Sequence, residues 1–220
     1  MAGGIPIIKT LREGLASNKI NRIYGILNGT CNYILSVMRQ TGQEFADILA
    51  DAQRLGYAEA DPSFDVDGID AAHKLAILAA IAFQTPIDFN SVHVQGIRFI
   101  SPTDIDFATE LGYRIKLLGI AELLENGVQQ RVRPCLVSVN TPIAQVEDVF
   151  NAVAAEADGL GTSLSYGRGA GAGPTSSAVL SDLLDFANNR RVGFLGGNQS
   201  YLKEKSARKL QTLLGSYYLR

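Results

Sequence analysis

The sequence lacks tryptophan and has only two cysteines and two histidines among its 220 residues. Cys31 and Cys135 are too few for a disulfide framework or a zinc cluster. His73 and His93 have neither the spacing of metal ligands nor that of a catalytic triad. The longest apolar run, Leu75–Phe83, has nine residues, whereas a membrane span needs ~20. These absences predict a cytoplasmic protein with reduced thiols and no membrane contact.

Charge is also scarce. Charged residues make up 19% of the chain, below the ~25% of a typical protein, so we expect a second domain or a second copy to cover much of the surface. The net charge of −2 argues against a nucleic-acid-binding protein. Residues 190–220 carry a net charge of +6. Such a segment is typical of a solvated connector, although it can also bind phosphate. The opening residues Met1-Ala2-Gly3-Gly4 do not resemble a signal peptide.

Hydrophobic periodicity predicts both helices and strands. Helices are expected from Pro6 onward and over 31–39, 44–55, 69–83, 103–111 and 175–187, and strands over 22–27, 92–97, 114–125, 128–140, 151–157, 160–166 and 217–219. Thr30 and Thr103 are predicted N-caps, residues 59–67 an acidic loop, and Asn126-Gly127 a hairpin turn. Because no regular βαβ rhythm is present, we predict an α+β fold with a mixed, largely antiparallel sheet, helices on one face, and dimerisation through the sheet.

Asp70 and Lys74 are four residues apart and therefore share one face of the predicted 69–83 helix. The usual meaning of such a pair is a surface ion pair of a few tenths of a kcal/mol. Here, however, the helix is apolar nearly all round, so we expect the lysine to be partly buried. Burial favours the neutral amine and can make a lysine an acid/base catalyst.

Acidic residues cluster just before this helix. Asp65-Val66-Asp67-Gly68 resembles part of a calcium loop, but that register puts Lys74 where a glutamate ligand is required, which excludes an EF-hand. We interpret Asp65 and Asp67 as charges that favour a helix N-terminus. Glu59, beside Gly56 and Tyr57, is a candidate for binding a ligand amine.

Glycines cluster at two places. Residues 167–173 have glycine at every second position before a helix, but match neither G-x-G-x-x-G nor a P-loop. The segment either exposes backbone N–H groups to an anion or a flat ring, or is a flexible loop. Gly3-Gly4 either lets carbonyl oxygens approach a hard cation or is a frayed terminus.

Five segments together carry a resemblance to a known family. They are Gly3-Gly4-Ile5-Pro6-Ile7-Ile8, Asn28-Gly29-Thr30-Cys31-Asn32-Tyr33-Ile34, Leu55-Gly56-Tyr57-Ala58-Glu59-Ala60-Asp61-Pro62, Asp67-Gly68-Ile69-Asp70-Ala71-Ala72-His73-Lys74-Leu75, and Gly167–Gly173 before Pro174-Thr175. In this order they resemble homoserine dehydrogenase over roughly residues 3–190. The resemblance implies interconversion of L-aspartate 4-semialdehyde and L-homoserine with NAD or NADP, in threonine and methionine biosynthesis.

The resemblance also assigns roles in a site for a small amino-acid substrate. Lys74, with Asp70, matches the catalytic position and is expected to give a proton to the carbonyl oxygen. Asp70 and Glu59 match the carboxylates that bind the substrate's amino end. The pocket is further lined by Gly56, Tyr57 and Thr30. This assignment agrees with the chemistry, because an aldehyde gains charge on oxygen during reduction and a cationic amine needs carboxylates.

Two further sites follow from the resemblance alone. Gly169 and Gly171 match the loop that closes over the cofactor. Gly3 and Ile5 match main-chain carbonyls that bind a monovalent cation such as sodium.

The sequence departs from the family at both ends. No dinucleotide fingerprint is present, so the family's N-terminal Rossmann domain is missing. Residues 217–220 resemble the start of a regulatory ACT domain. We therefore expect a catalytic and dimerisation domain over 1–190 and a basic connector over 191–220, a homodimer, and no turnover by the chain alone. The alternatives are a non-enzymatic assembly module and a related amino-acid dehydrogenase with another substrate.

Overall fold

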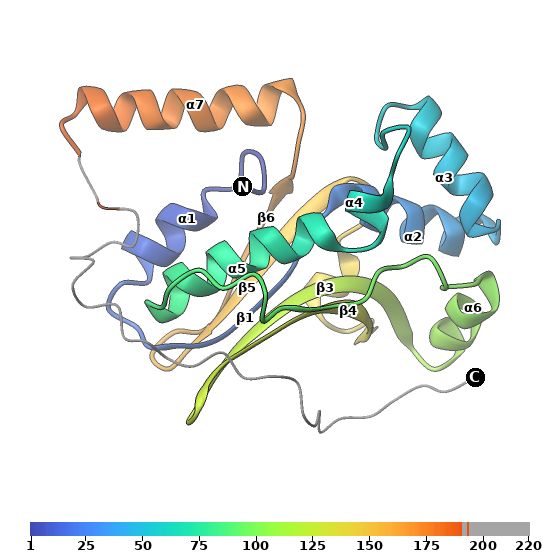
Figure 1. Cartoon of the computed structure of the whole chain (residues 1–220), viewed down its shortest axis with the longest axis horizontal. Helices are drawn as coiled ribbons and strands as arrows, with labels where there is room; N and C mark the ends of the chain where they lie inside the picture. The colour runs from blue at the N-terminus through green and yellow to red at the C-terminus, as the bar shows by residue number, and fades with distance from the viewer. Residues whose placement is uncertain (191–192, 194–220) are drawn as a thin grey trace.

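The computed structural model describes residues 1–190 and 193, and its centre is a six-stranded sheet (Figure 1). The strands are β1 Ile20–Ile26, β2 His93–Val94, β3 Tyr113–Leu124, β4 Gly127–Ser138, β5 Phe150–Ala157 and β6 Gly161–Arg168. Their order is β2-β4-β3-β1-β5-β6, and every pairing is antiparallel except the parallel pair β2–β4. The prediction of an α+β fold with a mixed, largely antiparallel sheet is confirmed.

The structure also contains helical segments. They are α1 Ile7–Lys9, the π-helical η1 Thr10–Gly14, α2 Gly29–Thr41, α3 Phe45–Arg54, α4 Ser63–Val66, α5 Ile69–Phe83, α6 Pro102–Glu110, the 3₁₀ helix η2 Pro142–Gln145 and α7 Ala172–Ala187. In Figure 1, α5 runs across one face of the sheet, and α7 lies on the outside of the molecule. No residue of α7 is buried.

Side chains alternate between the two faces of the sheet and enter two separate cores. Ile23, Leu117 and Val153 point to the helix side and join the large core beneath α5. Ile26 and Leu118 point the other way and join a small core that η2 covers. Among the described residues, the second face is therefore covered at one end only.

The predicted N-caps are wrong at two helices. Asn28, not Thr30, caps α2, because its side-chain oxygen accepts the Cys31 N–H at 2.8 Å. Ser101, not Thr103, caps α6 in a capping box with Asp104. Pro102 then occupies the first helical position, where its missing N–H costs nothing.

Other boundaries differ more modestly. The expected acidic loop contains the short helix α4, and the strand expected over 92–97 is reduced to His93–Val94. The glycine-rich segment is partly the end of β6, and α7 already begins at Ala172. The strand expected over 217–219 and the connector over 191–220 lie outside the described residues, apart from residue 193.

Candidate functional site

The Asp70–Lys74 pair forms on α5 as the spacing predicts. Lys74 Nζ lies 2.7 Å from Asp70 Oδ2 and also donates to the main-chain oxygen of Leu27 at 3.2 Å. The lysine and aspartate side chains are 27% and 19% exposed. The amine is therefore fixed at the end of β1 while remaining accessible to a small ligand.

Asn28 joins this pair to a second carboxylate that the sequence analysis did not place in the site. Its Nδ2 donates to Asp70 Oδ2 at 2.9 Å and to Asp65 Oδ1 at 2.7 Å. Burial raises the pKa of Asp65, the hydrogen bond from Asn28 opposes this shift, and the charges of Asp70 and Glu59 add to it. Asp65 therefore lies in the first turn of α4, as expected of a helix N-terminal charge, and also contacts the site through Asn28. Two features of the sequence could have indicated this role for Asp65: the Asn28 segment of the resemblance and the acidic cluster before α5.

The segment with Gly56, Tyr57 and Glu59 lies over the start of α2. The Thr30 hydroxyl donates to the Tyr57 main-chain oxygen at 2.7 Å, and Gly56 turns the chain after α3 with a φ of 76°. Gln53 Nε2 holds the Glu59 carbonyl at 2.9 Å. Glu59 is exposed, and its charge adds to the raised pKa of Asp65. Among the residues predicted to bind substrate, the structure thus shows contacts between Thr30 and Tyr57 and between Asp70 and Lys74.

The predicted cofactor and cation residues also meet. A Cβ on Gly3, whose φ is 55°, would lie 2.6 Å from the Arg168 carbonyl oxygen and 2.6 Å from the Gly169 carbonyl carbon. Ile5 packs against Gly167, with Cγ1 3.1 Å from the position of a Cβ there. The amino-terminal glycines therefore lie against the end of β6.

Asn151 connects these glycines to the carboxylate cluster, and the sequence analysis missed it. A Cβ on Gly169 would lie 2.3 Å from Asn151 Oδ1, and a Cβ on Gly29, the first residue of α2, would lie 3.4 Å from the same oxygen. Asn151 is 1% exposed, and its Oδ1 has no hydrogen-bond partner among the described residues. The helix start that carries Asn28 and the loop before α7 thus meet at one buried carboxamide.

The free thiols have no evident role at this site. Cys31 lies in the first turn of α2 and donates to the Asp65 carbonyl oxygen at 3.2 Å. Burial raises the pKa of this thiol well above its ordinary value, so it is not a reactive thiolate. Within residues 1–190 and 193, no group of three or more His, Cys, Asp or Glu side chains is arranged to hold a metal ion.

Comparison with known proteins identifies the family. The family model for homoserine dehydrogenase matches residues 6–184. The chain belongs to the homoserine dehydrogenase family. The resemblance seen in the sequence is therefore confirmed, and homoserine dehydrogenases are oxidoreductases.

Individual homoserine dehydrogenases agree with this match. The enzyme of Neisseria gonorrhoeae is 48% identical over 226 residues, a match that spans 100% of this chain and 52% of the relative. The crystal structure of a homoserine dehydrogenase from Thiobacillus denitrificans superposes with a TM-score of 0.91 at 50% identity, covering 96% of this chain and 51% of that one. A hyperthermophilic archaeal homoserine dehydrogenase in complex with NADPH has a TM-score of 0.72 at 30% identity, covering 86% and 54%. The chain therefore spans about half the length of these relatives.

The described helices were also compared with the length and hydrophobicity that a membrane span requires. None of those in the described part of the chain is both long and apolar enough to cross a bilayer.

Proposed function

We propose that this chain supplies the substrate-binding and proton-transfer part of an enzyme that interconverts L-aspartate 4-semialdehyde and L-homoserine with NAD(P)H. The reaction would serve threonine and methionine biosynthesis in the cytoplasm. The observation that carries the proposal is the Asp70–Lys74 pair, which is anchored by Asn28 and partly exposed. Membership of the homoserine dehydrogenase family supports the same reaction.

The proposed roles follow from charge and position. Glu59 and Asp70 bind the cationic amino group of the substrate, with Asp65 as a further negative charge nearby. Lys74 Nζ gives a proton to the carbonyl oxygen as that oxygen gains negative charge, and takes it back from the hydroxyl in the reverse direction. Asp70 Oδ2 accepts from both Lys74 and Asn28, which orients the ammonium group. Thr30 and Tyr57 close the pocket through their mutual hydrogen bond.

A bound NAD(P) would supply hydride chemistry to this site. Gly169 and Gly171 would lie against such a group, because neither carries a Cβ and Gly171 is exposed at the N-cap of α7. Gly3 and Ile5 remain the proposed carbonyl ligands of a monovalent cation. We place most cofactor contacts on a further domain of the full-length protein, and expect the chain alone to have no turnover.

Two surfaces support this arrangement. α7 exposes five large apolar side chains, as expected for a helix that packs on a further domain: Val179, Leu180, Leu183, Leu184 and Phe186. The uncovered face of the sheet supports a homodimer, because apolar side chains of β5 and β6 remain partly exposed there.

The decisive test is kinetic. We would measure NADPH oxidation by L-aspartate 4-semialdehyde with the full-length protein and its Lys74→Ala variant. A positioned acid/base contributes about 10²–10⁴-fold, so a loss of at least ~100-fold is expected. Lys19→Ala, which removes an exposed lysine distant in sequence, is the matched control and should keep full activity.

The other outcomes separate the alternatives. An active protein with an unimpaired Lys74→Ala variant would mean that the proton comes from elsewhere. A folded, dimeric but inactive full-length protein would favour the assembly module instead. Turnover by the 220-residue chain alone, at the full-length rate, would contradict the need for a further domain.

A further inference from the structure

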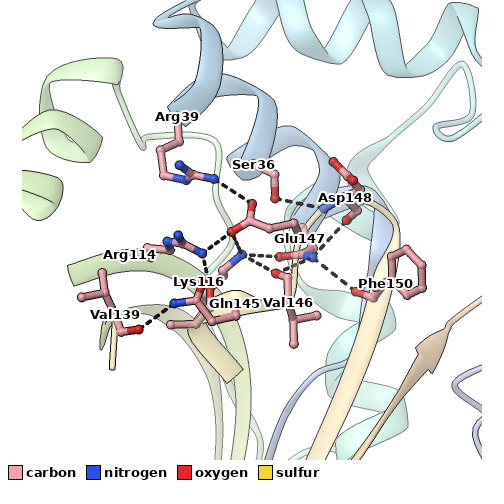
Figure 2. Close-up of polar contacts among 12 residues, drawn as sticks. Ser36, Arg39, Arg114, Lys116, Val139, Gln145, Val146, Glu147, Asp148 and Phe150 are labelled. Carbon is pink, nitrogen blue, oxygen red and sulfur yellow. Dashed lines mark hydrogen bonds and ion pairs between the residues drawn. The ribbon is translucent and has the colours of Figure 1, made fainter. Parts of the chain in front are cut away.

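A lysine is buried on the sheet face opposite α5. Lys116, in β3, is 2% exposed, and its Nζ donates to the Val146 main-chain oxygen at 2.5 Å (Figure 2). It also donates to Asn32 Oδ1 at 3.1 Å. Glu147 Oε1 lies 3.5 Å away. A well-packed apolar side chain often serves stability as well as a buried ion pair does. Stability alone therefore does not account for a lysine here.

Three cationic side chains surround Glu147. Arg39 from α2 donates to Oε2 at 3.0 Å, and Arg114 from β3 donates to Oε1 at 2.7 Å, beside Lys116 (Figure 2). Burial lowers the pKa of Lys116 to about 8, although the charge of Glu147 opposes the shift. Burial alone would raise the pKa of Glu147, but the charge of Lys116 and the hydrogen bonds from Arg39 and Ser36 outweigh it and lower the pKa. The cluster thus holds a carboxylate beside a lysine whose pKa is lowered to about 8.

Asn32, a residue of α2, links this cluster to the helix. Its Oδ1 accepts from Lys116, and its Nδ2 donates to the main-chain oxygens of Val146, Asp148 and Phe150 at 3.2, 3.0 and 3.3 Å. The carboxamide is 2% exposed. It therefore fastens residues 146–150 to the helix.

The same loop packs against the first turn of α2. The Val149 main-chain oxygen would lie 2.8 Å from a Cβ on Gly29, so these backbones are in direct contact. Asn28, the preceding residue, holds Asp65 and Asp70. Asn32 is one helical turn further on, and its N–H bonds the Asn28 carbonyl at 3.3 Å.

We propose that Lys116 is a positioning residue for the active site: through Asn32 and residues 146–150 it holds the first turn of α2, and so the side chain of Asn28, against Asp65 and Asp70. This inference rests on the proposed function of the Asp70–Lys74 pair. Lys116 itself touches neither substrate nor cofactor in this scheme.

The positioning effect of Lys116 should depend on pH. The ammonium has three N–H donors for the oxygens of Asn32, Val146 and Glu147, whereas the neutral amine has two and turns a lone pair toward an acceptor. The charged groups facing it are Glu147, Arg114 and Arg39. Positioning should weaken as the pH rises through about 8. Removing the charge of Glu147 should lower that pH, because the attraction that favours the ammonium is lost.

The test uses the full-length protein with Lys116→Met, Glu147→Gln and the control Val128→Ala, which trims a core residue at the far end of the β3–β4 hairpin. Steady-state kinetics are measured across pH 6.5–9.5, with hydrogen exchange of residues 28–33 as a readout independent of substrate. At pH 7 Lys116→Met should reduce kcat/KM by about 10- to 100-fold, the scale of a displaced active-site group. It should also abolish the decline near pH 8 and speed exchange in residues 28–33.

The remaining variants complete the test. Glu147→Gln should move the decline in kcat/KM to lower pH. If Lys116→Met does not fold, this shift is the test of the positioning role. Val128→Ala should keep the wild-type profile and exchange. Identical behaviour of Lys116→Met and Val128→Ala would overturn the inference. A third result would separate the two proposals. If the wild-type protein does not turn over these substrates but Lys116→Met still speeds exchange, the positioning role is supported and the proposed function is contradicted.

Discussion

Gly169 leaves no room for a side chain. A Cβ there would lie 2.3 Å from both Cγ and Oδ1 of Asn151, which is buried and has no space to turn away. We expect Gly169→Ala to lower the free energy of unfolding by about 1–3 kcal/mol, the usual cost of overpacking. Urea denaturation measures the change.

Gly173→Ala is the matched control for this prediction. Nothing lies within 4 Å of a Cβ on Gly173, which is the second residue of α7. Alanine in a helix is favoured over glycine by roughly 0.5–1 kcal/mol, so this variant should be neutral or slightly stabilised. Equal unfolding midpoints for Gly169→Ala and the wild type would contradict the packing argument.

At the residue scale, the sequence predicted local pairs but not contacts between distant residues. Asp70 and Lys74 could be paired because four residues make one helical turn. The bond from Asn28 to Asp70 joins positions 42 apart in the chain and depends on how α2 meets α5. Lys116 looked like an ordinary strand residue, since its burial depends on a loop 30 residues later.

At the element scale, the N-cap of α6 can be tested by substitution. The Ser101 hydroxyl accepts the Asp104 N–H at 3.3 Å, and the Asp104 carboxylate accepts the Ser101 N–H at 2.9 Å. Ser101→Ala should cost about 1 kcal/mol of stability. Thr103→Ala should be nearly neutral, because this exposed residue lies inside the first turn. A larger loss for Thr103→Ala, measured by thermal or urea unfolding, would restore the cap predicted from the sequence.

Long elements were predictable and their ends were not. Periodicity located α5 and the β3–β4 hairpin to within a residue or two, because each buries many side chains. The predicted capping residue was wrong where two suitable residues lie close together in the sequence, as Asn28 and Thr30 do. β2 is short because the chain turns onto α4 at Gly96, where a Cβ would lie 2.2 Å from the Val66 oxygen. No local pattern encodes that contact.

At the scale of the whole molecule, the fold class followed from the order of elements, whereas the pairing order of the strands did not. β1 pairs with β3 and β5, each far along the chain, so the sheet is assembled by non-local contacts. The low charged fraction led us to expect covered surface, and we propose two surfaces for it: the exposed apolar side chains of α7 and the uncovered face of the sheet.

The uncovered face of the sheet leads to the last prediction. Leu164 and Tyr166 of β6 lie opposite Ala154 and Ala152 of β5, so they point to the face that η2 covers at one end only. They are 37% and 55% exposed. A partner sheet packed there would bury them, and a stable dimer needs about 800 Å² from each subunit.

We therefore expect the full-length protein to sediment as a dimer, and Leu164→Glu combined with Tyr166→Glu to raise its dissociation constant by about 100-fold or more, ~2.8 kcal/mol. The reason is that two carboxylates would lose their hydration in an apolar contact. Leu111→Glu, at a more exposed apolar residue after α6, is the control and should remain dimeric. If the paired glutamates leave the dimer intact, the subunits meet elsewhere, and the apolar face of α7 becomes the surface to mutate next.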